Sequence, residues 1–221
     1  MYKTETHAHV SEVSFCSQIP GAEMARLYAA AGYHTLFISD HFSENYFNHH
    51  RELTWPEKIH SFFSGYRSAR EAGEKLGLTV LPAAEISFKN NPNHYLVYGL
   101  TEEFLCAHPS ILDYTVEEFH GIAKENGLLL VQAHPYRDNP HNYTTPHAVD
   151  GIEIYNGNPG HDDHSDLAKK LADDNGLLST SGSDSHLYCD IGAAGVLSDE
   201  PIETAEDFIA LIRGRKQQII R

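Results

Sequence analysis

The chain has 221 residues, which suits one sizeable hydrophobic core and is short for two independent domains, so we expect a single domain over residues 1–221. Its 41% hydrophobic and 10% aromatic residues exclude a disordered protein. No apolar run reaches the roughly 18 residues of a transmembrane helix, and the N-terminus has no apolar leader, so we expect no membrane contact and a cytoplasmic location.

The net charge of −15, from 16 Lys+Arg against 31 Asp+Glu, bears on the partners of the protein. Nucleic-acid binding by counterion release needs a basic face, so the charge predicts that no nucleic-acid polymer is bound. The same acidity would repel a small phosphate substrate unless bound cations reverse the local charge. Sixteen histidines are a source of ligands for such cations.

Strand-like and helix-like segments alternate along the chain. We expect strands near residues 4–9, 35–39, 79–84, 95–98, 128–133, 151–155, 178–181 and 194–197. We expect helices near residues 21–31, 56–76, 116–126, 164–175 and 204–213. This α/β alternation predicts a mostly parallel sheet with helices outside it, either open or closed into a barrel.

Polar residues able to bind metals follow six of these expected strands. They are His7 with His9, Asp40 with His41, Glu85, His134, Asn156, and Asp184 with His186. In parallel α/β folds the residues that carry chemistry gather at the carboxyl ends of the strands. The positions therefore predict one shared site.

Two of these groups have the spacing of a metal-binding pair. In a strand, residues i and i+2 point to the same face, so His7 and His9 can reach one ion. Either pair alone is a weak signal, but Asp184 and His186 repeat the spacing. Asp40 is interpreted as a buried residue that orients a ligating imidazole, with an ordinary helix cap as the alternative.

Seven motifs occur in order over nearly the whole chain: T-H-A-H at 6–9, D-H at 40–41, Glu85, His94 before an apolar strand, A-H-P at 133–135, E-I-Y-N-G at 153–157 and G-S-D-S-H at 182–186. This set resembles the PHP (polymerase and histidinol phosphatase) superfamily of metal-dependent phosphoesterases. The resemblance implies a distorted (β/α)7 barrel with two or three divalent ions, of Mn, Fe or Zn. It implies eight metal ligands: His7, His9, His41, Glu85, His94, His134, Asp184 and His186.

The resemblance also implies roles for these ligands. Glu85 bridges two of the ions, and Glu85, Asp184 and His186 are the catalytic residues. In relatives similar to histidinol phosphatases the third ion takes one more histidine, at the position of Gln18 here. An amide is a poorer ligand for a transition metal, so either Glu12 or Cys16 compensates, or the third site is weak or empty.

We expect the protein to hydrolyse a small-molecule phosphate monoester, such as a nucleotide or sugar phosphate. A metal-activated hydroxide would attack the phosphorus. Arg137 and Lys89, which follow ligands closely, are the expected substrate-binding residues. Residues 42–55 are expected to form a loop that acts as a lid. The alternatives are a histidinol phosphatase, a phosphodiester-cleaving enzyme and a non-catalytic, metal-bound regulatory domain.

Overall fold

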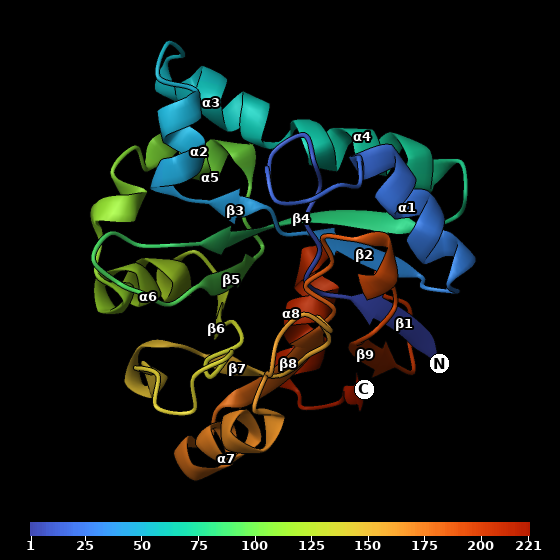
Figure 1. Ribbon diagram of the computed structural model, residues 1–221, viewed down its shortest axis with the longest axis vertical. Helices are drawn as coiled ribbons and strands as arrows, with labels where there is room; N and C mark the ends of the chain where they lie inside the picture. Colours follow the sequence, from blue (N-terminus) through green and yellow to red (C-terminus); the bar gives the residue numbers. More distant parts are fainter.

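The computed structural model describes residues 1–221 and is shown in Figure 1. Its strands are β1 (Tyr2–Glu5), β2 (Thr35–Ile38), β3 (His41–Phe42), β4 (Thr79–Ile86), β5 (Tyr95–Tyr98), β6 (Leu129–Gln132), β7 (Gly151–Asn156), β8 (Leu178–Gly182), β9 (Gly195–Ser198) and β10 (Gln218–Ile220). Its α-helices are α1 (Gly21–Ala30), α2 (Glu44–His49), α3 (Trp55–Phe62), α4 (Ser64–Glu74), α5 (Glu102–Ala107), α6 (Val116–Glu125), α7 (Ser165–Asn175) and α8 (Ala205–Arg213). The 3-10 turns are η1 (Ile111–Asp113), η2 (Pro146–Ala148) and η3 (Tyr188–Asp190).

The strands form one sheet in the order β10-β9-β1-β2-β4-β5-β6-β7-β8, and β3 pairs with β4 beside this path. The β1–β2–β4 and β6–β7–β8 runs are parallel, whereas β5, β9 and β10 run antiparallel to their neighbours. The two ends of the sheet meet, because Ser181 Oγ donates to the Ile220 carbonyl at 3.0 Å and Gln217 Nε2 donates to the Ser179 carbonyl at 2.7 Å. The expected α/β barrel is confirmed in a nearly closed, distorted form.

Alternation along the strands separates the barrel interior from its outer layer. Leu36 and Ile38 of β2 pack in the cluster beneath α1 and α4, while Phe37 between them faces inward. Inside, Phe37 and Tyr98 contact Phe208 of α8, with ring centroids 4.8 and 4.7 Å apart. In Figure 1 the strands surround α8. Apolar side chains of α8 therefore fill one end of the barrel. The opposite end is left for polar side chains.

The expected helix at 56–76 is wrong in one respect, because it is two helices, α3 and α4, that meet at Phe63. A capping box between Thr54 and Glu57 starts α3. In α4, Gly65 lies so close to Gly21 of α1 that a Cβ on Gly21 would collide with the Gly65 carbonyl. α4 is therefore packed closely on α1.

The expected long loop at 42–55 is also wrong as a description of structure. Ser43 precedes α2, and Tyr46 of that helix is buried. Phe47 and Trp55 pack against the largest hydrophobic cluster. The aromatic residues of this segment pack it against the core. The segment therefore consists of the end of β3, the helix α2 and a turn, and not of one long loop.

Candidate metal centre

The predicted ligands meet at one end of the barrel although they come from distant parts of the chain. After β1 ends, His9 N donates to the Ser185 carbonyl at 3.0 Å, and Ala8 forms a parallel bridge with Ser185. This pairing sets the H-x-H segment alongside the D-x-H segment. Their side chains therefore face the same space.

Glu85 lies at the centre of the cluster and is fully buried on β4. Its Oε1 lies 3.5 Å from His7 Nε2, 3.1 Å from His94 Nδ1 and 2.9 Å from His134 Nε2. Its Oε2 lies 2.6 Å from His41 Nδ1 and 3.8 Å from His9 Nε2. The two oxygens thus face different sets of imidazoles, which is the arrangement that a bridging carboxylate requires.

Asp184 completes the inner part of the cluster from the other side. Its Oδ1 lies 3.4 Å from His7 Nε2 and 3.1 Å from His9 Nε2. Ligand atoms of His7, His134 and Asp184 lie within 4.8 Å of one another, as do those of His7, His9 and Glu85, and those of Glu85, His94 and His134. Three donors at such mutual distances can share one ion.

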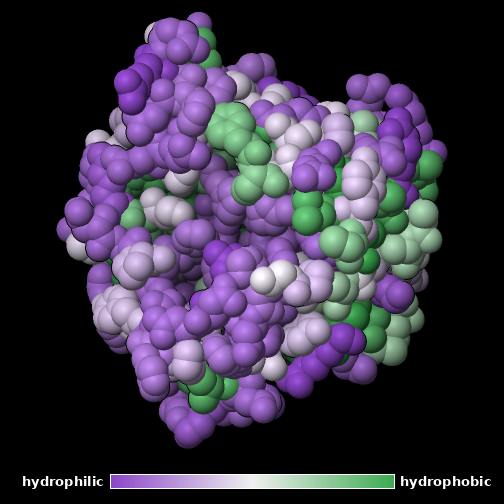
Figure 2. Space-filling model, in the orientation of Figure 1, coloured by the Kyte–Doolittle hydropathy of each residue, from purple (hydrophilic) through white to green (hydrophobic).

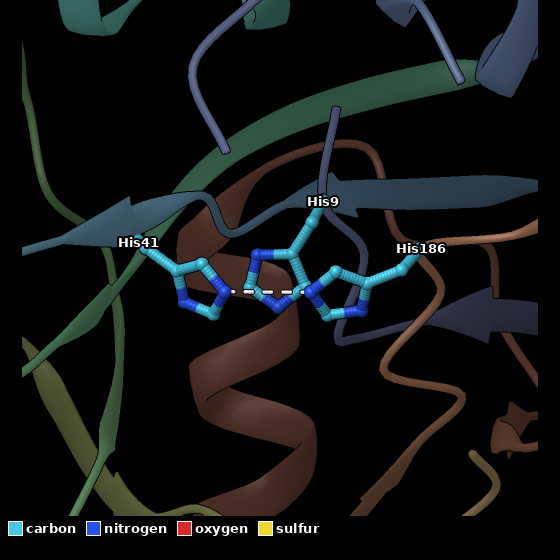
Figure 3. Close-up of side chains that lie close together, drawn as sticks. All are labelled: His9, His41 and His186. Atoms are coloured by element: carbon cyan, nitrogen blue, oxygen red, sulfur yellow. Dashed lines mark hydrogen bonds between the residues drawn. The ribbon is translucent and has the colours of Figure 1, made fainter. Parts of the chain in front are cut away.

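A further group of donors consists of three histidines, His9, His41 and His186, whose ring nitrogens also lie within 4.8 Å of one another. Figure 3 shows the imidazoles converging from three separate chain segments. His41 Nε2 and His186 Nε2 are 3.3 Å apart. Three imidazole nitrogens form a donor set typical of zinc, iron and other first-row metals.

Four buried polar atoms at the centre make no well-formed hydrogen bond, although they lie 2.6–3.8 Å from other donor atoms of the cluster. They are His7 Nε2, His9 Nε2, Glu85 Oε2 and Asp184 Oδ1. Burying a polar atom without a partner costs free energy, and native proteins rarely tolerate it. Four such atoms facing one another, all of them good metal donors, fit divalent ions.

The charges at the centre also suit cations. Burial raises the pKa of the Glu85 carboxyl, but the charges of His94 and His41 outweigh burial and hold that pKa well below its usual range. Burial acts likewise on Asp184, and the neighbouring His7 and His9 hold its pKa well below the usual range. Both carboxylates are therefore ionised near neutral pH.

Two of the proposed ligands are among the six non-glycine residues with a positive φ. His134 has φ of 25° and Asp184 has φ of 51°, a left-handed backbone that residues other than glycine rarely adopt. Such conformations cost about 1–3 kcal/mol each and occur where a site over-determines them. Here they turn the side chains at the ends of β6 and β8 toward the barrel axis.

Glu153, which the sequence left without a role, connects three parts of the centre. Its Oε1 lies 2.9 Å from His7 Nδ1, and its Oε2 accepts hydrogen bonds from His134 N and Asn156 Nδ2, both at 3.0 Å. Asn156 Nδ2 also donates to Asp184 Oδ2 at 3.3 Å. A carboxylate that accepts a hydrogen bond from the imidazole nitrogen that does not face the metal fixes the orientation of the ring. It also makes the other nitrogen a stronger metal ligand.

A second buried carboxylate, Glu5, was missed as well. Its Oε1 accepts from the backbone N–H groups of His7 and Ser183, both at 2.9 Å, and its Oε2 accepts from Tyr28 Oη at 2.8 Å. Burial raises the pKa of Glu5 to about 7 against these hydrogen bonds. Glu5 ties the H-x-H segment to the segment that carries Asp184. Nothing in the sequence around Glu5 distinguished it, because β1 is itself polar.

Asp40 orients a histidine other than its neighbour. Asp40 Oδ1 accepts from Val10 N at 2.8 Å and from Ser14 Oγ at 2.7 Å, and Ser14 Oγ lies 3.4 Å from His9 Nδ1. Asp40 therefore acts on His9 through Ser14, while His41 points into the cluster.

Of the residues considered for the missing third-site ligand, only Cys16 is near the histidines. Glu12 instead binds the N-terminus of α1, where both of its carboxylate oxygens accept a hydrogen bond from Gly21 N at 2.9–3.0 Å. Cys16 is exposed and lines one pocket together with His41 and His186. Partial burial raises the pKa of its thiol, but the neighbouring His186 and His41 outweigh burial and lower that pKa to about 6. The side chain of Gln18 is in no such contact and the residue is exposed.

The two expected substrate-binding residues lie in different places. Arg137 Nη1 donates to Asp184 Oδ2 at 3.1 Å, so its guanidinium is at the centre. Lys89 Nζ instead pairs with Asp113 at 2.5 Å and with Glu44 at 3.5 Å on the surface. Lys89 lines a separate pocket with Trp55. Its charge is already balanced there, so the structure gives no support for a role with substrate.

The chain is similar in sequence or fold to several known proteins. A family model described as PHP-associated matches residues 163–216. No curated protein matches the sequence. Among solved structures, a two-domain protein from Bacteroides vulgatus that contains a predicted PHP-like metal-dependent phosphoesterase is 17% identical, with a TM-score of 0.72 over 99% of this chain and 64% of that one. The chain thus spans less than two thirds of that protein.

Endonuclease Q is a second similar structure. The lesion-specific enzyme from Pyrococcus furiosus is 16% identical, with a TM-score of 0.62 over 99% of this chain and 57% of that one. Endonuclease Q bound to a 27-mer duplex with an abasic lesion at its active site is 15% identical, with a TM-score of 0.62 over 96% of this chain and 56% of that one.

The expectation that no nucleic-acid polymer is bound is therefore wrong, because a protein of this fold acts on duplex DNA. Net charge describes the whole chain, whereas binding depends on the charge of the face that carries the site.

No helix of the structure is both long and apolar enough to cross a bilayer. The match to the PHP-associated model covers residues 163–216, and the solved structures share the barrel fold over nearly the whole chain.

Proposed function

We propose that this protein hydrolyses phosphate monoesters at a centre of two or three divalent ions. The observation that carries the proposal is the buried cluster of imidazole and carboxylate donors around Glu85 and Asp184, four of whose atoms make no well-formed hydrogen bond. Such a set is costly to keep unless cations occupy it. A protein with a net charge of −15 repels an anionic phosphate ester unless bound cations reverse the charge of the site.

In this proposal His7, His9, Glu85 and Asp184 would hold one ion, and Glu85, His94 and His134 would hold a second, so that Glu85 would serve both. Divalent ions supply positive charge for phosphate oxygens and acidify water to near neutral pH. Mn, Fe and Zn all suit this mixture of imidazole and carboxylate donors.

The protein's own groups would bind the phosphate and move protons. Arg137, whose guanidinium lies 3.1 Å from Asp184, would grip phosphate oxygens. His186 is partly exposed, and its Nδ1 is fixed 2.9 Å from the Asp184 carbonyl. Its Nε2 is then available either to a third ion with His9 and His41, or to protonate the leaving oxygen.

A test combines metal loading with a panel of phosphate esters. Purified protein with Mn²⁺ is assayed on mononucleotides, sugar phosphates and histidinol phosphate, with Glu85→Ala as the inactive variant. We expect phosphate release by the wild type and at most 1/1,000 of that rate by Glu85→Ala, an effect on the order of that seen when catalytic residues are removed. Equal turnover by the two proteins would show that the site is misplaced.

Phosphodiester cleavage in DNA is a second candidate, favoured by the likeness to endonuclease Q. The same assay therefore includes a duplex with one abasic site. Cleavage of this duplex without hydrolysis of any monoester would support the second candidate. Tight metal binding with no hydrolysis of any ester would support a non-catalytic regulatory domain.

A further inference from the structure

Two pockets of different chemistry meet at the metal centre. One, of about 240 Å³, lies between the segment at residues 13–16 and the start of α2. The other, of about 410 Å³, extends toward Arg137 and His161. Both are lined by Cys16, His41 and His94, so the proposed ligands His41 and His94 form the border between them. In Figure 2 this hydrophilic face of the molecule is hollowed near its middle.

The larger pocket carries the positive charge. Arg137 is the one lysine or arginine that lines either pocket. His161 stands beside it, and its Nδ1 lies 2.5 Å from Asp138 Oδ2, a contact that fixes the ring. A phosphate group with its negative oxygens is therefore favoured on this side of the border.

The smaller pocket has no lysine, arginine, aspartate or glutamate in its lining. Phe15 is 51% exposed there, with the His49 ring centroid 4.6 Å from its own, whereas Tyr46 of α2 is buried and only borders the pocket. Ser43, Asn45 and Ser87 provide uncharged hydrogen-bonding groups. An exposed aromatic face with neutral polar neighbours suits a flat, uncharged organic ring.

We propose that the smaller pocket binds the leaving group of the substrate, and that this group is an uncharged alcohol bearing a planar ring that stacks on Phe15. The inference rests on the proposed function. The volume of about 240 Å³ lies below the usual range of sites for drug-sized ligands, so the group has the size of a phenol or a nucleoside. In the reaction, the oxygen of a water forms the new bond to phosphorus and the bond to the alcohol oxygen breaks. That oxygen takes a proton, and the neutral alcohol leaves from the Phe15 side.

The test compares one ester that has a ring with one that does not. Values of kcat/KM for phenyl phosphate and for sn-glycerol 3-phosphate are measured with Mn²⁺ for the wild type, Phe15→Ala and Phe15→Tyr. The ratio between the two esters is compared across proteins, because intrinsic reactivity cancels in that comparison. We expect the ratio to fall roughly fivefold in Phe15→Ala, from lost stacking, and to be retained in Phe15→Tyr.

The matched control is Leu76→Ala, since Leu76 is a similarly exposed apolar side chain, 49% exposed, at the start of the turn before β4. This variant should leave the ratio unchanged. An unchanged ratio in Phe15→Ala, or a wild type that prefers sn-glycerol 3-phosphate, would overturn the inference and leave phosphate-ester hydrolysis standing. Failure of the wild type to hydrolyse either ester would overturn the proposed function and this inference with it.

Discussion

Glu153→Gln is expected to weaken metal binding although Glu153 touches no proposed ion. The carboxylate accepts on both sides, from His7 Nδ1 at 2.9 Å and from His134 N and Asn156 Nδ2 at 3.0 Å. Glutamine keeps the shape but has one oxygen only. If that oxygen faces His7, the amide NH₂ points at two N–H donors, and if it turns round, His7 loses its acceptor. Either way, one side of the centre is left without a partner.

The magnitude follows from the position of this residue behind the ligands. Loss of a carboxylate that orients a ligating histidine lowers metal affinity about 10- to 100-fold, which is roughly 1.4–2.8 kcal/mol. The affinity is measured by competition for Zn²⁺ against a fluorescent chelator at fixed pH. Circular dichroism of the metal-free protein checks that the variant is folded.

Glu117→Gln is the matched control. Glu117 Oε1 lies 2.9 Å from His147 Nε2, the same distance as in the Glu153–His7 pair, but the Glu117 pair is exposed and remote from the other ligands. This variant should bind Zn²⁺ as the wild type does. If Glu153→Gln retained wild-type affinity, the role of Glu153 in orienting His7 would be refuted.

Three further outcomes are expected. Arg137→Ala should raise KM about 10- to 100-fold with little change in kcat, because a charged hydrogen bond to phosphate is lost, and a selective fall in kcat would contradict this. If Cys16 contributes to the third site, Zn²⁺ should slow its alkylation by iodoacetamide, measured by mass spectrometry, more than that of the exposed Cys189. Equal protection of the two thiols would exclude Cys16. Tyr28→Phe should lower the free energy of unfolding by about 1–3 kcal/mol in urea denaturation, because buried Glu5 loses a donor, and an unchanged midpoint would argue against that network.

The convergence of the donor residues could be predicted because each lies at a strand end and two pairs have i, i+2 spacing. The strand-end rule holds even where β5 runs antiparallel, since His94 precedes β5 and so lies at the same end of the barrel as Glu85. The alternation of elements predicted an α/β sheet, open or closed, and the resemblance of the motifs to the PHP superfamily implied the barrel.

Contacts that depend on tertiary packing could not be predicted. Glu153 and Glu5 look like ordinary strand residues until their partners, 146 and 178 positions away, are brought together. Lys89 was chosen for its distance along the chain from Glu85, but β4 ends at Ile86 and the chain then leads Lys89 away to Asp113. The break at Phe63 between α3 and α4 is likewise not revealed by the periodicity of the segment.

The central claim is that divalent ions occupy the cluster around Glu85. Metal content per chain, determined by inductively coupled plasma mass spectrometry on protein purified without chelators, tests it most directly when the wild type and Glu85→Ala are compared. The account predicts two or three equivalents of Mn, Fe or Zn in the wild type and less than one in a folded Glu85→Ala. A wild type that binds no ion even after incubation with Mn²⁺ or Zn²⁺, or a variant that keeps the full complement, would contradict it.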